Sequence, residues 1–180
     1  MGVMRIVGGQ FRGKLLHSPH DRGVRPTSDR TREALFNILE HDTGIRERRF
    51  LDLFCGTGAV GLEAYSRAAA EVWLMDRDLT VAARNVEAFG NPPTVFLRRR
   101  NLPTMARPPA RFDIVFLDPP YQSDLVEPAL GQLRQGWLAE DCRLVIELSS
   151  KTPFAPPTGF VLEQERRYGA AKLVFLSCRC

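Results

Sequence analysis

Residues 51–61 of the chain read Leu51-Asp52-Leu53-Phe54-Cys55-Gly56-Thr57-Gly58-Ala59-Val60-Gly61. This stretch is a short apolar run followed by a G-x-G-x-x-G pattern, which leads into a helical segment. Gly56 and Gly58 allow the backbone to turn tightly and to approach a ligand, and Gly61 allows a helix to pack closely on a strand. We therefore predict a buried strand, a ligand-binding turn and a helix, in this order.

The rest of the chain extends this unit into an open, mostly parallel α/β sheet. Short apolar segments alternate with helical segments from Phe50 onward, which is typical of βαβ units in a Rossmann-like fold. Two further segments, separated by a short loop at Gly169, predict an antiparallel hairpin at the C-terminal end. The expected parallel strands are Phe50–Phe54, Val72–Met75, Thr94–Leu97, Ile114–Leu117 and Leu144–Leu148, the crossover helices are Ala59–Ala69, Leu79–Phe89 and Leu125–Gln135, and the hairpin strands are Phe160–Tyr168 and Lys172–Cys178.

Residues 1–44 are expected to form a small basic extension that packs on an α/β domain of residues 45–180. The segment Met4–Leu16 contains glycine-centred turns and predicts a β-hairpin. A helix is expected to begin near Thr27 or Ser28, because either residue can cap it and Asp29 suits the positive end of its dipole.

Length and composition exclude several classes of protein. The chain has 180 residues, of which 44% are hydrophobic and 26% charged, as in a single soluble domain. No segment is long and apolar enough to span a membrane, and no secretory signal is visible. The four cysteines have no C-x-x-C spacing and no histidine partner at zinc spacing, which disfavours a metal site and a disulfide scaffold. We expect a cytoplasmic protein with reduced thiols and no metal.

Arginine dominates the positive charge, because 22 of the 25 basic residues are Arg and the formal net charge is +4. Arginine binds phosphate and stacks on bases, so this balance fits a nucleic-acid partner, although a GC-rich genome that replaces Lys by Arg explains it equally well. Residues 1–35 hold seven basic and three acidic residues, so the excess lies near the N-terminus. In the alternative interpretation, Arg30 and Arg32 only solvate a helix and Arg25 orders its cap. The candidate phosphate ligands are Arg5, Arg12, Lys14, Arg25, Arg30 and Arg32.

Two acidic residues indicate which cofactor the glycine turn binds. Asp76 lies 20 residues beyond Gly56, at the end of the second expected strand, where a carboxylate can bind ribose hydroxyls. Asp52 precedes the turn, where its charge repels a pyrophosphate but attracts a cationic ammonium group. S-adenosylmethionine carries such a group, so the sequence favours this cofactor over a nicotinamide dinucleotide.

A second motif follows the fourth expected strand, where the sequence reads Asp113-Ile114-Val115-Phe116-Leu117-Asp118-Pro119-Pro120-Tyr121. The carboxyl ends of the strands form the ligand-binding edge of an open α/β sheet. The Asp118 carboxylate and the Pro119 carbonyl can accept the two hydrogens of an exocyclic base amine, which directs the nitrogen lone pair at a methyl sulfonium. Pro120 helps to fix the backbone, and Tyr121 can stack on the base. Glu147, in the fifth expected strand, either supports this site or pairs with an arginine.

Together with two N-terminal segments, these motifs resemble the bacterial guanine-N2 methyltransferases of small-subunit (16S) ribosomal RNA, the RsmD family. The resemblance covers nearly the whole chain from Met4. It implies that the glycine turn, Asp76 and Asn101 bind S-adenosylmethionine. It also implies that the residues from Asp118 to Tyr121 bind guanine and that the basic N-terminal part binds RNA. The chain departs from the family pattern at Leu74, where an acidic residue is usual. The matching segments are Met4-Arg5-Ile6-Val7-Gly8-Gly9-Gln10-Phe11-Arg12-Gly13, Arg25-Pro26-Thr27-Ser28-Asp29-Arg30-Thr31-Arg32-Glu33-Ala34-Leu35-Phe36-Asn37, Asp52–Gly61 and Asp118-Pro119-Pro120-Tyr121.

The expected protein is an S-adenosylmethionine-dependent methyltransferase that acts on the exocyclic N2 amine of one guanine in 16S ribosomal RNA, within the small subunit or an assembly intermediate. An N6-adenine methyltransferase acting on DNA or RNA is the alternative, because the Asp-Pro-Pro-Tyr motif suits either amine. Asp52 and that motif disfavour a nicotinamide-dependent oxidoreductase. The intact Asp118 and glycine turn disfavour a non-catalytic RNA-binding module.

Overall fold

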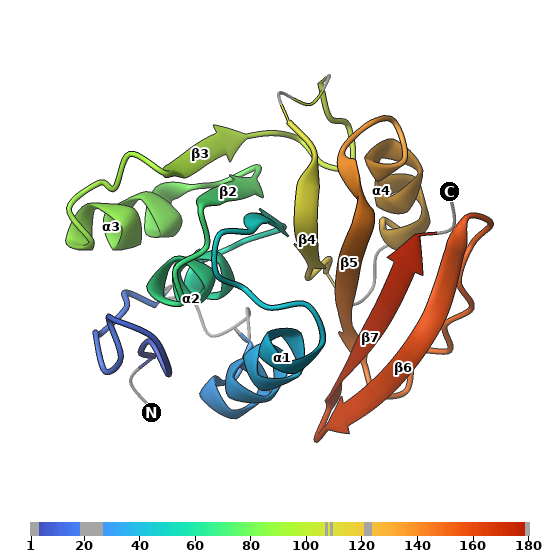
Figure 1. Cartoon of the computed structure of the whole chain (residues 1–180), viewed down its shortest axis with the longest axis horizontal. Helices are drawn as coiled ribbons and strands as arrows, with labels where there is room; N and C mark the ends of the chain where they lie inside the picture. The colour runs from blue at the N-terminus through green and yellow to red at the C-terminus, as the bar shows by residue number, and fades with distance from the viewer. Residues whose placement is uncertain (1–3, 19–26, 107, 109, 121–123, 179–180) are drawn as a thin grey trace.

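The computed structural model describes residues 4–18, 27–106, 108, 110–120 and 124–178, and these form one seven-stranded sheet with helices on both faces (Figure 1). The strands are β1 (Arg49–Leu53), β2 (Glu71–Asp76), β3 (Val95–Arg99), β4 (Phe112–Leu117), β5 (Leu138–Ser149), β6 (Phe160–Tyr168) and β7 (Ala171–Cys178), and the helices are α1 (Asp29–Asp42), α2 (Ala59–Ser66), α3 (Thr80–Ala88) and α4 (Val126–Leu133).

The strand order is β3-β2-β1-β4-β5-β7-β6. Strands β1 to β5 pair in parallel, whereas β7 pairs antiparallel with β5 and with β6. The last two strands form the red and orange hairpin at one end of the sheet in Figure 1. The predicted Rossmann-like α/β sheet with a C-terminal antiparallel hairpin is therefore confirmed.

Most elements lie within about two residues of their predicted bounds, and the two largest differences have physical reasons. β5 begins at Leu138 instead of Leu144, because its polar first half still pairs with the sheet through the Phe112–Leu138 register. α2 ends at Ser66 instead of Ala69, because Ala68 adopts a left-handed conformation with a φ of 66°. Neither feature leaves a signal in hydrophobic periodicity, which detects buried faces and not chain reversals.

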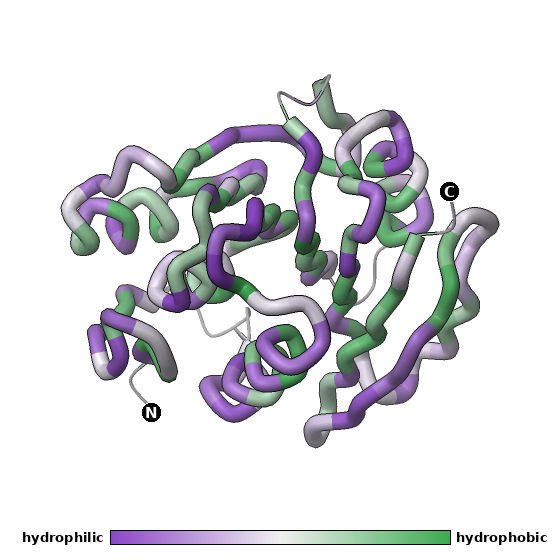
Figure 2. Tube along the Cα trace, in the orientation of Figure 1, coloured by the Kyte–Doolittle hydropathy of each residue, from purple (hydrophilic) through white to green (hydrophobic). Residues whose placement is uncertain are grey.

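Apolar side chains fill the space on both faces of the sheet. The N-terminal segment and α1, α2 and α3 cover one face, where Phe36, Leu62 and Phe50 are buried together. α4 and connecting segments cover the other face, where Leu130 packs with Leu51. Full burial of one such side chain contributes about 1.5–3 kcal/mol. Figure 2 shows the strands in the middle of the molecule as largely hydrophobic, with the polar residues on the outer elements.

The N-terminal segment is anchored to this core. Arg5 forms an antiparallel bridge with Leu15, and the Ile6 N–H donates a hydrogen bond to the Lys14 carbonyl at 2.9 Å, so the predicted hairpin is present in a short form. The Gln10 N–H donates to the Ser66 carbonyl at 2.8 Å, which attaches the hairpin to the end of α2.

α1 begins where the capping pattern predicts. The Ser28 hydroxyl accepts a hydrogen bond from the Thr31 N–H at 3.1 Å, and the helix starts at the next residue, Asp29. No helix in the described part of the chain is long and apolar enough to cross a membrane.

Candidate active site

The sheet has its topological switch point between β1 and β4, because the chain proceeds from β1 to β2 and β3 on one side and places β4 and β5 on the other. In open α/β sheets, ligands bind at such a point, outside the carboxyl ends of the strands. The glycine turn follows β1 there, and Asp118 follows β4. The Asp118 N–H donates a hydrogen bond to the Leu53 carbonyl at 3.2 Å, so the two sequence motifs begin on neighbouring, hydrogen-bonded backbones.

The glycine turn needs its first two glycines for different reasons. Gly58 has a φ of 74°, and a Cβ added there lies 3.0 Å from Leu74 Cδ1 and 3.4 Å from the Ala82 Cβ. Its N–H donates to the Cys55 carbonyl at 2.7 Å, which closes the turn. Gly56 has a φ of 51° and is exposed, and no described atom lies within 4 Å of a Cβ added there. The turn is therefore tightly packed on its inner side and open to a ligand on its outer side.

Asp76, the last residue of β2, fastens the glycine turn to the neighbouring strand. Its Oδ2 accepts a hydrogen bond from the Gly56 N–H at 2.9 Å, and its Oδ1 accepts one from the Arg77 N–H at 2.6 Å. Leu74, which stands where the resembled family has an acid, is fully buried and lies against the position of Gly61 in α2. Of these two β2 residues, only the half-buried Asp76 reaches the ligand-binding edge.

Asp52 lies beneath the turn with only 1% of its surface exposed, and its Oδ2 accepts a hydrogen bond from the Gly61 N–H at 2.9 Å. Burial raises the pKa of Asp52 to about 8, against the opposing effect of this hydrogen bond and with a further rise from the charge of Asp76. A nearby cation favours the ionised form of such a carboxyl group. The geometry thus suits the predicted interaction with an ammonium group.

Cys55 lies inside the turn, where the surroundings disfavour the thiolate form of its side chain. Burial, together with the charges of Asp52 and Asp76, raises the pKa of its thiol well above the ordinary value. Because the thiolate is the reactive form, Cys55 acts as a small apolar part of the turn.

Asp118 and its neighbours form a row of carboxylates along the edge. Burial raises the pKa of Asp118 well above its ordinary value, and the charges of Glu147, Asp52 and Asp76 raise it further. These four acids come from the adjacent strands β2, β1, β4 and β5, or directly follow them. A cationic ligand at this edge would favour the ionised forms of these buried acids. In the described ranges, no group of three or more His, Cys, Asp or Glu side chains is arranged to hold a metal ion.

The remaining predicted residues of the cofactor and base sites differ in their exposure to solvent. Pro119 is buried and Pro120 is exposed directly after Asp118, while Tyr121 lies outside the described residues. Asn101 is exposed and follows Arg100, whose N–H donates to the Asp76 carbonyl at 2.9 Å, so the end of β3 brings Asn101 to the same edge.

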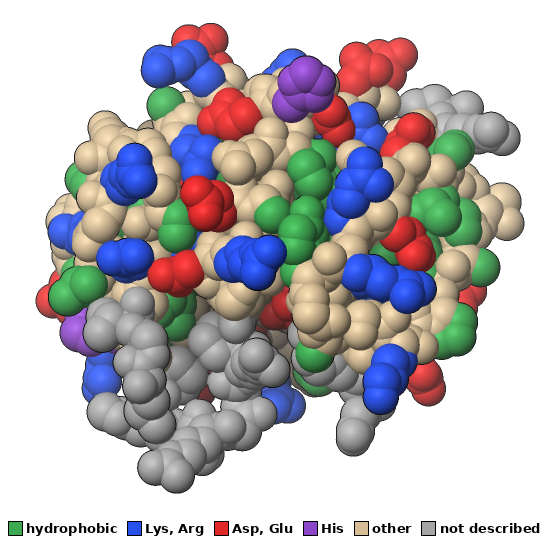
Figure 3. Space-filling model, turned by 90° about the horizontal axis from the view of Figure 1, so that it is seen from below, with side chains coloured by type: hydrophobic (Ala, Val, Ile, Leu, Met, Phe, Trp, Pro, Cys, Tyr) green, Lys and Arg blue, Asp and Glu red, His purple; other side chains and the backbone are tan. Residues whose placement is uncertain are grey.

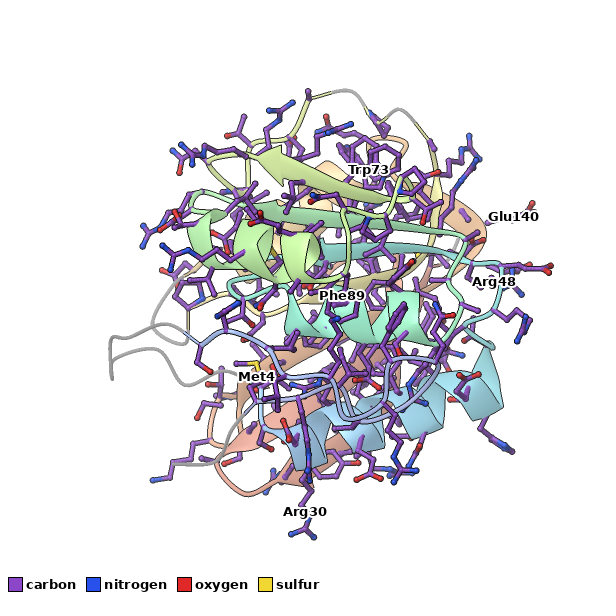
Figure 4. The ribbon with its side chains drawn as sticks, turned by 90° about the vertical axis from the view of Figure 1, so that its left-hand side faces the viewer. Met4, Arg30, Arg48, Trp73, Phe89 and Glu140 are labelled. Carbon is purple, nitrogen blue, oxygen red and sulfur yellow. The ribbon has the colours of Figure 1, made fainter. Side chains whose placement is uncertain are left out.

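Three of the predicted phosphate ligands are exposed to solvent, namely Arg5, Arg12 and Arg30. Figure 4 shows Arg30 projecting away from the ribbon. Lys14 is half-buried, with its Nζ 4.9 Å from the centre of the Phe89 ring, a cation–π contact that holds it against the protein. Arg25 lies outside the described residues.

The prediction that Arg32 binds phosphate is wrong, because its side chain is fully buried. Its Nη2 lies 2.8 Å from Asp29 Oδ1, and its Nε lies 3.6 Å from Glu63 Oε2. The guanidinium therefore faces carboxylates inside the protein and neither solvates α1 nor reaches RNA. Glu63 is a further residue of this cluster that the sequence motifs do not single out. It is the only charged residue of α2, and a charge on a helix that is almost completely buried needs a partner.

Fold and site together define a Rossmann-like methyltransferase, and comparisons with known proteins agree. A family model described as "Conserved hypothetical protein 95" matches residues 4–177. The chain therefore belongs to this family, and the resemblance predicted from its motifs is confirmed.

Curated relatives and a solved structure match most of the chain. "Ribosomal RNA small subunit methyltransferase D" of Escherichia coli (strain K12) is 38% identical over 158 residues, covering 81% of this chain and 75% of the relative. The protein of the same name from Haemophilus influenzae is 33% identical over 176 residues, covering 93% and 90%. A solved structure described as "Putative methyltransferase yhhF from Escherichia coli" superimposes with a TM-score of 0.83 at 34% identity and covers 98% of both chains.

Proposed function

We propose that this protein transfers the methyl group of S-adenosylmethionine to the exocyclic N2 amine of one guanine in 16S ribosomal RNA. The observation that carries the proposal is the pairing of the two motifs at the switch point, where the Asp118 N–H binds the Leu53 carbonyl. Methyl transfer requires the donor and the acceptor to be held side by side in a fixed orientation. The names of the relatives indicate the class of substrate.

The edge of the sheet fits S-adenosylmethionine in shape and charge. The open backbone at Gly56 allows close approach, and Asp76 lies where a carboxylate can bind ribose hydroxyls. Asp52 and the rest of the carboxylate row favour the positive charges of the ammonium and sulfonium groups, whereas they oppose the pyrophosphate of a nicotinamide dinucleotide. Asn101 stands at the same edge and completes the predicted cofactor set. When bound, the cofactor supplies a methyl group activated by its sulfonium.

Asp118 and Pro119 are the groups that hold the base amine. The Asp118 carboxylate and the Pro119 carbonyl accept its two hydrogens, which orients the nitrogen lone pair toward the cofactor side of the switch point. Asp118 accepts the proton that the amine loses only in its ionised form, which the positive charge of the bound cofactor favours against the effect of burial. Pro120 fixes the backbone and Tyr121 stacks on the base in this proposal.

Residues 1–44 serve as the RNA-binding extension in this proposal, with residues 45–180 as the catalytic domain. The face of the molecule seen in Figure 3 carries basic and acidic side chains interspersed, without one continuous basic field. We assign binding of the RNA backbone to the exposed arginines of this extension, Arg5, Arg12 and Arg30. Arg25 and Lys14 complete the predicted set.

The test is incubation of the protein with labelled S-adenosylmethionine and small subunits that lack the modification, followed by nucleoside analysis. N2-methylguanosine in 16S RNA is the expected product. Parallel samples with naked 16S RNA and with assembly intermediates identify the form of the substrate. Asp118→Ala is expected to abolish labelling, whereas Asp141→Ala, which removes an exposed acid from β5, leaves it unchanged. N6-methyladenosine in RNA or DNA, with no methylguanosine, would overturn the proposal in favour of the adenine alternative.

A further inference from the structure

β4 ends beside Ile146 of β5, which continues to Ser149 at the ligand-binding edge. Phe116 pairs with Val145 in the parallel register, and both belong to the core on the α1 side of the sheet. Side chains alternate along a strand with a period of two, so Asp118 and Glu147 are neighbours on that same face. The electrostatics agree with this placement, because after burial the charge of Glu147 is the largest cause that raises the pKa of Asp118.

Thr27, which lies two residues before α1, binds the Glu147 side chain. The Thr27 hydroxyl donates a hydrogen bond of 2.6 Å to Glu147 Oε2, and the two residues are only 7% and 3% exposed. The Thr27 carbonyl accepts a hydrogen bond of 3.3 Å from Arg32 Nη1, while Arg32 Nη2 donates to the Arg5 carbonyl. Thr27 is therefore a fixed part of the N-terminal extension and not a mobile hydroxyl.

We propose that Glu147 is a positioning residue for methyl transfer, which orients Asp118 while Thr27 holds Glu147 in place. This inference rests on the proposed function, because Asp118 is the group that holds the base amine there. The hydrogen bond from Thr27 fixes Glu147 Oε2, so the Glu147 side chain limits the positions open to its neighbour Asp118. The negative charge of Glu147 also favours the uptake of a proton by Asp118. The N-terminal extension thereby becomes part of the catalytic machinery in addition to binding RNA.

The charges that act on Asp118 make the effect of Glu147 measurable by pH. Besides Glu147, they are the carboxylates of Asp52 and Asp76. β7 places the apolar Leu173 opposite Glu147, and its neighbour Lys172 is paired with Glu165 at 2.9 Å. Arg32 of α1 donates to the Thr27 carbonyl, so these two cations have partners other than Asp118. Loss of the Glu147 charge should therefore lower the pKa of Asp118.

The experiment compares four variants for kcat, KM and the pH dependence of kcat. Glu147→Gln keeps an acceptor for the Thr27 hydroxyl but removes the charge, so we expect kcat to fall by about 10-fold and the acidic limb of its pH profile to move to lower pH. Thr27→Val is expected to lower kcat, and Thr27→Ser is expected to restore it. Thr31→Val is the matched control, because Thr31 is a buried threonine four residues further along, in the first turn of α1, and its hydroxyl contacts that of Ser28. The KM for S-adenosylmethionine should change little in each case.

Circular dichroism melting curves separate these effects from loss of folding. A wild-type kcat with an unshifted pH profile in Glu147→Gln would overturn the inference, and so would an equal loss of kcat in Thr27→Val and Thr31→Val. Wild-type protein assayed in parallel distinguishes failure of this inference from failure of the proposed function. If it forms N2-methylguanosine while the variants do not differ from it, only this inference fails. If it forms none, the proposed function fails as well.

Discussion

Arg32 and Glu63 form an ion pair inside the protein, with Nε 3.6 Å from Oε2 and no exposed surface on either side chain. Glu63 also accepts hydrogen bonds from the Val7 N–H at 2.8 Å and from Arg67 Nε at 3.0 Å. This one carboxylate therefore joins the N-terminal segment, α1 and α2. Removing one partner of a buried pair leaves an uncompensated charge, which costs about 3–5 kcal/mol.

The first prediction concerns this pair. Arg32→Ala is expected to lower the free energy of unfolding by about 3 kcal/mol or more, because the charge of Glu63 loses a buried partner. Arg30→Ala removes an exposed arginine from the same helix and should change it by less than about 0.5 kcal/mol. Urea unfolding measures both variants. Weakened RNA binding by Arg32→Ala at unchanged stability would return Arg32 to the RNA-binding surface.

The second prediction concerns Asp52 and pH. Its pKa is raised from 3.8 to about 8 in the folded protein, so between these values the folded state holds a proton that the unfolded state has lost. Stability therefore falls as pH rises through this range. Asp118 contributes with the same sign, because its pKa is also raised. Asp52→Asn should make the ligand-free protein more stable at pH 8 and flatten the pH dependence of its unfolding.

The same substitution should weaken cofactor binding. In the wild type, affinity for cationic S-adenosylmethionine should increase as pH rises toward 8, because ionised Asp52 binds the ammonium group better. Calorimetry across a pH series should show this increase and its absence in Asp52→Asn. Equal pH dependence in both proteins would remove Asp52 from the cofactor site.

Local patterns predicted some parts of the site and long-range packing determined others. The start of α1 follows from Ser28, whose cap involves only the next helical turn. The charge of Arg32 alone predicts a surface position, whereas the helical period places it on the buried face with Leu35 and Phe36. The bond between Thr27 and Glu147 joins residues 120 positions apart, and no local pattern contains such information.

The third prediction concerns the glycine turn. Gly58→Val is expected to abolish S-adenosylmethionine binding and to destabilise the fold, because it forces a branched side chain to a φ of 74° and against Leu74. Gly44→Val is the matched control, since Gly44 has a φ of 72° but no neighbour within 4 Å of an added Cβ. The control should show backbone strain, on the order of 1–3 kcal/mol, and normal cofactor affinity. Loss of affinity in both variants would mean that general destabilisation is responsible.

The fourth prediction concerns Asp118. Asp118→Ala should reduce kcat by at least about 100-fold while leaving the affinity for S-adenosylmethionine nearly intact, since the removed acceptor acts at the base amine. Asp118→Asn keeps one acceptor oxygen but cannot take up a proton, so its kcat should lie between those of the alanine variant and the wild type. Single-turnover kinetics with saturating cofactor measure this step. Near-normal turnover in the alanine variant would contradict the role of the Asp-Pro-Pro-Tyr motif.

The last prediction concerns the exposed arginines of the N-terminal extension. Arg5, Arg12 and Arg30 are exposed. Replacing Arg5 by alanine keeps its backbone carbonyl, which accepts the hydrogen bond from Arg32. Each phosphate contact releases counterions, so each lost contact should lower the slope of log K against log salt by roughly 0.7–0.9. The triple alanine variant should bind RNA more weakly and with a flatter salt dependence.

A matched control removes positive charge from β6, outside residues 1–44. Arg166 and Arg167 are exposed on the edge strand β6, so their double alanine variant tests whether net charge alone sets the affinity. The affinity for S-adenosylmethionine should remain that of the wild type in both variants, because none of these side chains lies at the carboxyl edge of β1 or β4. If the triple variant binds RNA with unchanged affinity across the salt series, the RNA-binding surface lies elsewhere. The run Arg98–Arg100, at the end of β3 beside Asp76, is then the next candidate.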